Sequence, residues 1–72
     1  MNVTVERPKG LPATFTRCVA DVFERGVLTI SGQVNDVEMD RFAAGDWVSA
    51  VVTDDDGDLV VAFVADQMEK AS

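Results

Sequence analysis

The strongest constraint on the fold is a pair of apolar segments that flank a short run of aspartates. The first segment spans residues 46–53, the second spans residues 59–65, and the sequence between them reads Asp-Asp-Asp-Gly-Asp. Asp56-Gly57 is typical of a type I′ turn, because Asp and Gly tolerate the positive φ angles that this turn requires. The sequence therefore predicts an antiparallel β-hairpin over residues 46–65.

The first half of the chain supplies shorter strand candidates. Residues 3–5 and 27–31 are rich in β-branched side chains, which favour strands. Residues 13–23 carry apolar side chains on both faces, a pattern that favours one long strand bent so that its buried face changes. Two prolines and a glycine within residues 7–12 predict a loop.

The one predicted helix lies over residues 35–45. Asn35 suits the N-cap, and Glu38 three residues later completes a capping-box-like pair. Three apolar side chains fall on one helical face: Met39, Phe42 and Ala43. Gly45 is placed to end the helix. Residues 37, 39 and 41 also alternate, so a strand remains the alternative.

These elements predict an all-β fold, a small five-stranded barrel with one short helix before the fourth strand. At 72 residues the chain is a single domain over 1–72, with an N-terminal arm and loop at 1–12 and a frayed tail at 66–72. The predicted core is the following set: Val19, Val22, Leu28, Ile30, Phe42, Val48, Ala50, Val52, Val60, Ala62 and Val64.

The charge balance restricts the partners. Thirteen acidic residues against six basic ones give a net charge of -7, which disfavours unaided binding to nucleic acid or to anionic membranes. Aspartate outnumbers glutamate and lysine is scarce, which fits either an ordinary acidic domain or a halophile-like composition typical of proteins from a high-salt cytoplasm. In such salt the repulsion from phosphate is screened.

The single cysteine and the short apolar runs predict a cytoplasmic protein that does not cross a membrane. The single cysteine, Cys18, cannot form an internal disulfide, and the first residues lack the apolar core of a signal peptide. The longest apolar run, residues 59–65, is far shorter than the ~20 residues of a membrane span.

No residue pattern indicates catalysis or a cofactor. The chain has no histidine, and Cys18 has no partner base nearby, so we interpret it as a small buried side chain. The aspartates at 54–58 would suit a hard cation, but an EF-hand alignment on Gly57 would make Val52 and Phe63 ligands. We expect no catalytic residue, no metal site and no enzyme activity.

A family resemblance comes from the second half of the chain. Residues 42–52, Phe-Ala-Ala-Gly-Asp-Trp-Val-Ser-Ala-Val-Val, resemble the short helix, Gly-Asp turn and fourth strand of an OB-fold domain. Residues 59–64 resemble its closing strand, and SH3-like small barrels are similar. The resemblance is carried mainly by residues 42–64 and implies an OB-like or SH3-like barrel. RNA-binding OB domains are rich in basic and exposed aromatic residues, which residues 27–31 lack, so it implies fold rather than function.

Two functions follow as hypotheses. A chain this small cannot bury both apolar faces of 47–53 and 59–65, and large exposed apolar patches mark interfaces. The first hypothesis is therefore a non-enzymatic protein-interaction or self-associating module, whose partner is a protein or a second copy. Its predicted contact patch is Trp47, Val51, Leu59, Val61 and Phe63. The alternative is an OB-like single-domain nucleic-acid-binding protein that uses Arg17, Arg25 and Trp47.

Overall fold

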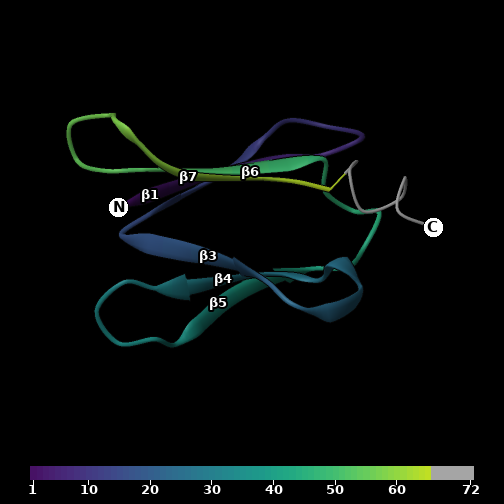
Figure 1. The fold of residues 1–72 in the computed structure, drawn as a ribbon, viewed down its shortest axis with the longest axis horizontal. Helices are drawn as coiled ribbons and strands as arrows, with labels where there is room; N and C mark the ends of the chain where they lie inside the picture. Colours follow the sequence, from purple (N-terminus) through teal and green to yellow (C-terminus); the bar gives the residue numbers. More distant parts are fainter. Residues whose placement is uncertain (66–72) are drawn as a thin grey trace.

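The computed structural model describes residues 1–65, which fold into seven strands in two antiparallel sheets (Figure 1). The strands are β1 (Asn2–Glu6), β2 (Ala13–Thr16), β3 (Cys18–Val22), β4 (Leu28–Gly32), β5 (Glu38–Phe42), β6 (Ser49–Thr53) and β7 (Leu59–Val64). A 3-10 turn, η1 (Glu24–Gly26), connects β3 to β4. The all-β prediction is confirmed, and the tail predicted at 66–72 lies outside the described residues.

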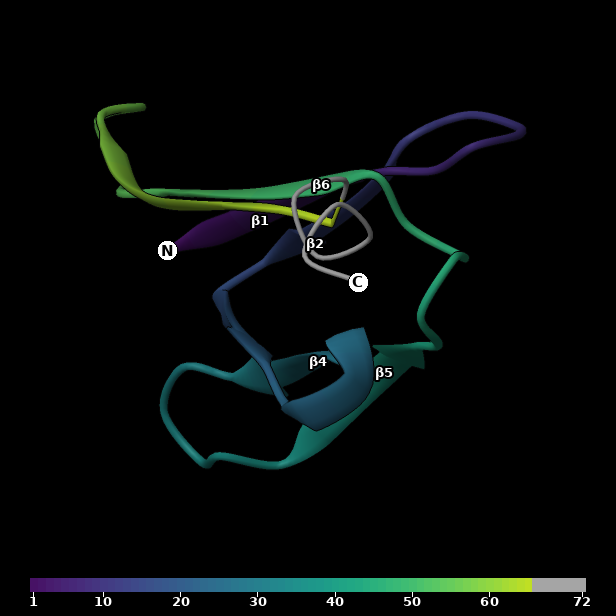
Figure 2. The same cartoon turned by 45° about the vertical axis from the view of Figure 1, so that its right-hand side comes forward.

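The two sheets form separate layers joined by two crossings (Figure 2). One sheet has the strand order β2-β1-β6-β7, and the other has the order β3-β4-β5. The chain first crosses between them at Arg17, which lies between β2 and β3 and adopts a φ of 57°. Strands that change sheets at a bend are a known way to make the corner of a β-structure. The bend predicted within residues 13–23 is therefore present, but the expected single strand is divided into β2 and β3, which lie in different sheets.

The core lies between the two layers. Val3 and Val5 of β1 are cross-strand partners of Val52 and Ala50 on β6, and all four are buried. The opposite layer contributes Leu28 and Ile30 of β4, with the rest of the buried apolar set being Cys18, Ala20 and Trp47. Buried residues alternate with exposed or half-buried ones along β1 and β6, which is the period of a strand with one face on a core.

The predicted helix at 35–45 is wrong, because residues Glu38–Phe42 form β5. Asn35 accepts a hydrogen bond from the Val37 amide through its side-chain oxygen, and this Asx turn lies in the loop between β4 and β5. Asparagine caps helices and shapes turns through the same local bond, so its presence did not distinguish the two. The alternation at 37, 39 and 41 was the better guide.

The five-stranded barrel is not confirmed. Among residues 1–65 the strands form two sheets and no closed ring. The count rises from five to seven because the strand at 13–23 divides at Arg17 and because the expected helix is a strand. The alternation at 37, 39 and 41 indicated the second change, whereas the apolar pattern does not fix the division at Arg17, where the backbone has a positive φ.

The terminal hairpin is confirmed, but its turn type is wrong. The Asp54 amide bonds the Asp58 carbonyl at 2.9 Å, and the Gly57 amide bonds the Asp54 carbonyl at 3.0 Å. Gly57 has a φ of 86°, whereas Asp56 is not among the residues with positive φ. A type I′ turn needs positive φ at both central positions, so the hairpin closes instead through a longer loop with one left-handed glycine.

The predicted core is correct on β4 and on β6 and wrong on β7. Phe63 is the cross-strand partner of Ala50, and Val61 is the partner of Val52, so these two β7 side chains lie on the core side. The expected core residues Val60, Ala62 and Val64 are exposed, as is Val48. Residues Val19, Val22 and Phe42 are half-buried. The loop between the strands sets the register, and shifting that register by one residue exchanges the two faces.

Candidate interaction surface

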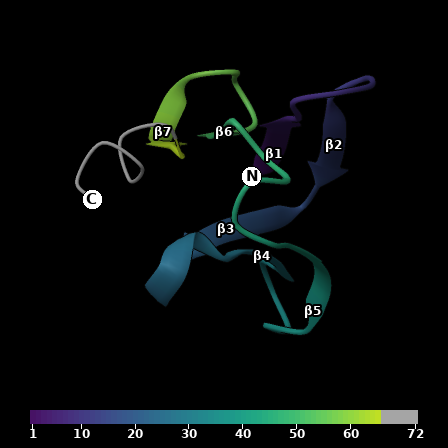
Figure 3. The ribbon, with the colours of Figure 1, turned by 90° about the vertical axis from the view of Figure 1, so that its right-hand side faces the viewer.

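The most exposed apolar element is β7, which lies at the end of the four-stranded sheet beside β6 (Figure 3). Its six residues, Leu-Val-Val-Ala-Phe-Val, include no charge. The exposed fractions of its large side chains are 65% for Leu59, 48% for Val60, 38% for Val61 and 45% for Val64. Apolar surface is therefore exposed on both faces of this strand.

The backbone of β7 also presents unpaired groups. The Ala65 amide donates to the Val48 carbonyl at 2.9 Å, and in an antiparallel ladder the groups that face the partner strand alternate. The amides and carbonyls of Ala62 and Val64 therefore point away from β6. No strand within residues 1–65 pairs with that side of β7. A bulge between Val52 and Thr53 shifts the register of β6 against β7, and it interrupts their ladder only near the aspartate loop.

Each of the other three edge strands carries a feature that discourages pairing, and in β3 it is the charged residue Asp21. β5 has charged residues at three of its five positions, Glu38, Asp40 and Arg41. Arg41 donates to the Glu38 carboxylate at 2.8 Å, and this bond raises the pKa of Arg41. β2 has only four residues and ends at the bend of Arg17. Charge and short length are common protections of sheet edges, and the regular part of β7, residues 61–64, has neither charge nor proline.

The structure does not bring the five residues of the predicted patch together on one surface. Trp47 is 2% exposed and belongs to the core, and Phe63 packs against that core. Val51 is half-buried and pairs with Ala62, on the face opposite to Val61. Leu59 and Val61 remain exposed members.

Sequence reasoning missed Val60, Ala62 and Val64 as surface residues because it assigned them to the core. The sequence feature that could have identified β7 as an interaction strand is its lack of charged residues. This feature bears on the edge of the strand and does not indicate which of its faces is buried. With these three, the exposed surface of β7 is a strip that runs the length of the strand. We call residues 59–64 the β7 edge.

The residues predicted to bind nucleic acid are dispersed. Arg17 precedes β3 and Arg25 lies in η1 after it, so the two arginines are at opposite ends of that strand. Both side chains are exposed, and both backbones have positive φ. The Trp47 indole is buried between the sheets and presents no face on which a base could stack. The structure assembles no basic and aromatic groove from these three residues.

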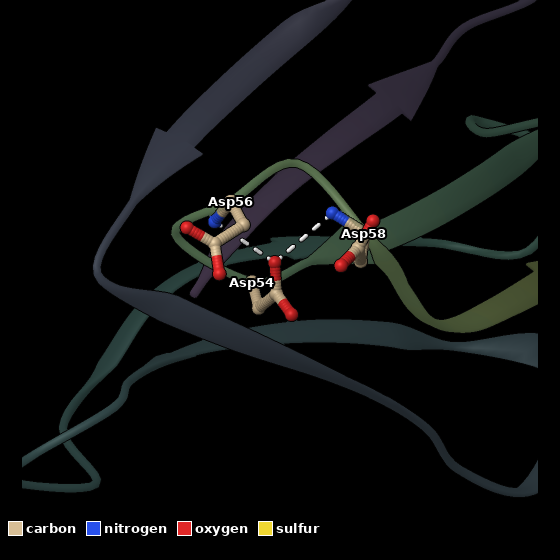
Figure 4. A group of neighbouring side chains, drawn as sticks. All are labelled: Asp54, Asp56 and Asp58. Atoms are coloured by element: carbon tan, nitrogen blue, oxygen red, sulfur yellow. Dashed lines mark hydrogen bonds between the residues drawn. The ribbon is translucent and has the colours of Figure 1, made fainter.

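Acidic side chains gather in the loop at residues 54–58 between β6 and β7, which we call the aspartate loop. Carboxylate oxygens of Asp54, Asp56 and Asp58 lie within 4.8 Å of one another (Figure 4). One Asp54 oxygen, Oδ1, accepts hydrogen bonds from the Asp56 and Asp58 amides, each at 2.9 Å. Asp54 therefore holds the turn, while the exposed carboxylates of Asp56 and Asp58 face solvent. Oxygen ligands of this kind suit hard cations.

Comparisons with known proteins identify no relative. The chain has no significant match among family models, curated proteins or solved structures. No helix within residues 1–65 has the length and apolar character needed to cross a bilayer.

Proposed function

We propose that the chain is a non-enzymatic protein-interaction module, built as a small, partly open barrel of the OB-like or SH3-like kind. The barrel assignment is supported by β2 and β3, which follow one another through the bend at Arg17 and lie in different sheets. A chain that passes from one sheet to the other at such a bend is typical of small barrels and orthogonally packed sheets.

The observation that carries the proposal is the β7 edge. It combines exposed apolar side chains on both faces with outward-pointing backbone groups at Ala62 and Val64. Proteins bind extended segments at such an edge by adding a strand to the sheet, with main-chain hydrogen bonds giving affinity. An uncharged edge that bound nothing would be an aggregation hazard, which favours a physiological partner.

Photo-crosslinking from the β7 edge tests this function. A photoreactive phenylalanine analogue replaces Leu59 in the producing cells, and the matched control places the same analogue at Val34. Val34 is also an exposed apolar residue, but it lies in the loop between β4 and β5 of the other sheet. We expect a discrete protein adduct, either with this chain or with another protein, from position 59 only. No adduct from position 59, or the same adducts from both positions, would contradict the function.

A further inference from the structure

We propose that the occupant of the β7 edge is a second copy of this chain, paired antiparallel so that the two four-stranded sheets become one continuous sheet. The proposal rests on the interaction function above and names its partner. Because a twofold pair presents the same surface from both copies, the surface must be complementary to itself. The β7 edge meets this condition, since it is apolar and uncharged along its whole length.

The hydrogen-bonding groups also match in an antiparallel pair. The amides and carbonyls of Ala62 and Val64 point outward, and in a twofold arrangement each copy offers the same groups to the other. Pairing around residues 62–64 uses the regular part of the strand and avoids the bulge near Val60. Cross-strand contacts would then join β-branched and aromatic side chains, which are favourable pairs in sheets.

The charge distribution selects this orientation. Asp54, Asp55, Asp56 and Asp58 lie at one end of β7, directly before Leu59. In a parallel, in-register pair the two aspartate loops would adjoin, with strands about 4.8 Å apart. In an antiparallel pair centred on Phe63 the two Leu59 residues are eight strand positions apart, or about 26 Å at ~3.3 Å per residue, and the two aspartate loops lie beyond them. This distance is several times the Debye length of ~8 Å at physiological salt, so the repulsion between the two aspartate loops is largely screened.

Sedimentation velocity over a range of protein concentrations tests the pairing in the full chain. Ala62→Lys introduces a charge on the exposed face of the β7 edge, and Val34→Lys makes the same charge change in the other sheet. We expect a concentration-dependent dimer whose dissociation constant rises by roughly tenfold or more in Ala62→Lys and stays unchanged in Val34→Lys. Because Trp47 is buried, its fluorescence emission reports whether each variant is folded.

Distance measurement by electron spin resonance tests the orientation. The label is attached at Asp56→Cys in a Cys18→Ala background, which leaves one thiol per chain. An antiparallel dimer gives a distance greater than about 26 Å between the two labels, from the strand rise used above, whereas labels in contact would overturn the proposed orientation.

Two further results would overturn the pairing while separating it from the proposed function. A folded wild-type protein that stays monomeric at all concentrations, yet gives an adduct with a different protein from position 59, contradicts self-pairing and leaves the interaction function supported. A dimer that Ala62→Lys and Val34→Lys weaken equally would place the contact elsewhere and also contradict the pairing.

Discussion

The indole Nε1 of Trp47 donates a hydrogen bond of 2.9 Å to the carbonyl oxygen of Gly26, and both residues are buried. Trp47 precedes β6 in one sheet, and Gly26 lies in η1, which leads into β4 of the other sheet. This bond therefore joins the two layers at the end opposite to the Arg17 crossing along β3. Tryptophan suits the position because its large ring fills the core while its N–H needs one partner.

Removal of this bond should weaken the fold measurably. Trp47→Phe keeps an aromatic ring but leaves the Gly26 carbonyl buried without its donor, which costs about 1–3 kcal/mol of unfolding free energy. Urea denaturation followed by circular dichroism measures the loss. The control is Phe23→Leu, because Phe23 is an exposed aromatic residue beside the same turn. Equal stability of Trp47→Phe and the wild type would contradict the structural role of the bond.

Substitution of Thr29, the second residue of β4, should stabilise the fold. Its side chain is buried, and its hydroxyl has no hydrogen-bond partner among the described residues. Thr29→Val preserves the shape and removes the unpaired hydroxyl, so the unfolding free energy should rise by about 1 kcal/mol. Thr14→Val on the exposed face of β2 should change it by less than ~0.5 kcal/mol. A destabilised Thr29→Val would show that the hydroxyl has a partner.

Substitution of Gly57 should destabilise the fold through the backbone conformation alone. Its φ is 86°, and an added Cβ would meet nothing within 4 Å, so no clash contributes. Gly57→Ala should lower the unfolding free energy by about 1–2 kcal/mol, whereas Gly57→Asn should cost less, because asparagine enters the left-handed region more readily. Thermal denaturation of the two variants measures the difference. Equal losses in both would contradict a conformational cause.

The folded state should become more stable as salt is added. With a net charge of -7 and four aspartates in one short loop, like-charge repulsion opposes the compact state. Raising NaCl from about 0.1 M to about 1 M shortens the Debye length from ~10 Å to ~3 Å, so the melting temperature should rise. The double variant Asp55→Asn/Asp56→Asn should show a smaller rise. A rise of the same size in both proteins would exclude repulsion within the loop as the cause.

The sequence predicted the class of fold through strand patterns and turn residues. Residues 49–53 and 59–64 alternate or run apolar between strong turn signals, and both form the expected strands. A bend within residues 13–23 was also predicted, because apolar side chains on both faces imply a change of buried face, but its position at Arg17 was not. These features are local, so they can be read without knowledge of the rest of the chain.

The features that were not predicted depend on partners distant in sequence. β7 exposes Val60, Ala62 and Val64 because its register against β6 follows the length of the aspartate loop, and a one-residue difference reverses the faces. Trp47 was expected on the surface, but its partner carbonyl on Gly26 is twenty-one positions away. The edge position of β7 is likewise a property of sheet order, which alternation within one strand does not specify.

Amide hydrogen exchange at Ala62 and Val64 reports on self-pairing through the β7 edge, because these outward-facing amides are the groups that a partner strand would cover. We expect their exchange to slow as protein concentration rises, while the Val34 amide in the other sheet's exposed loop exchanges at a constant rate. Exchange at Ala62 and Val64 that is fast and independent of concentration would contradict self-pairing through the β7 edge. Slow exchange in a strict monomer would also contradict it, by showing that the edge is covered within one chain.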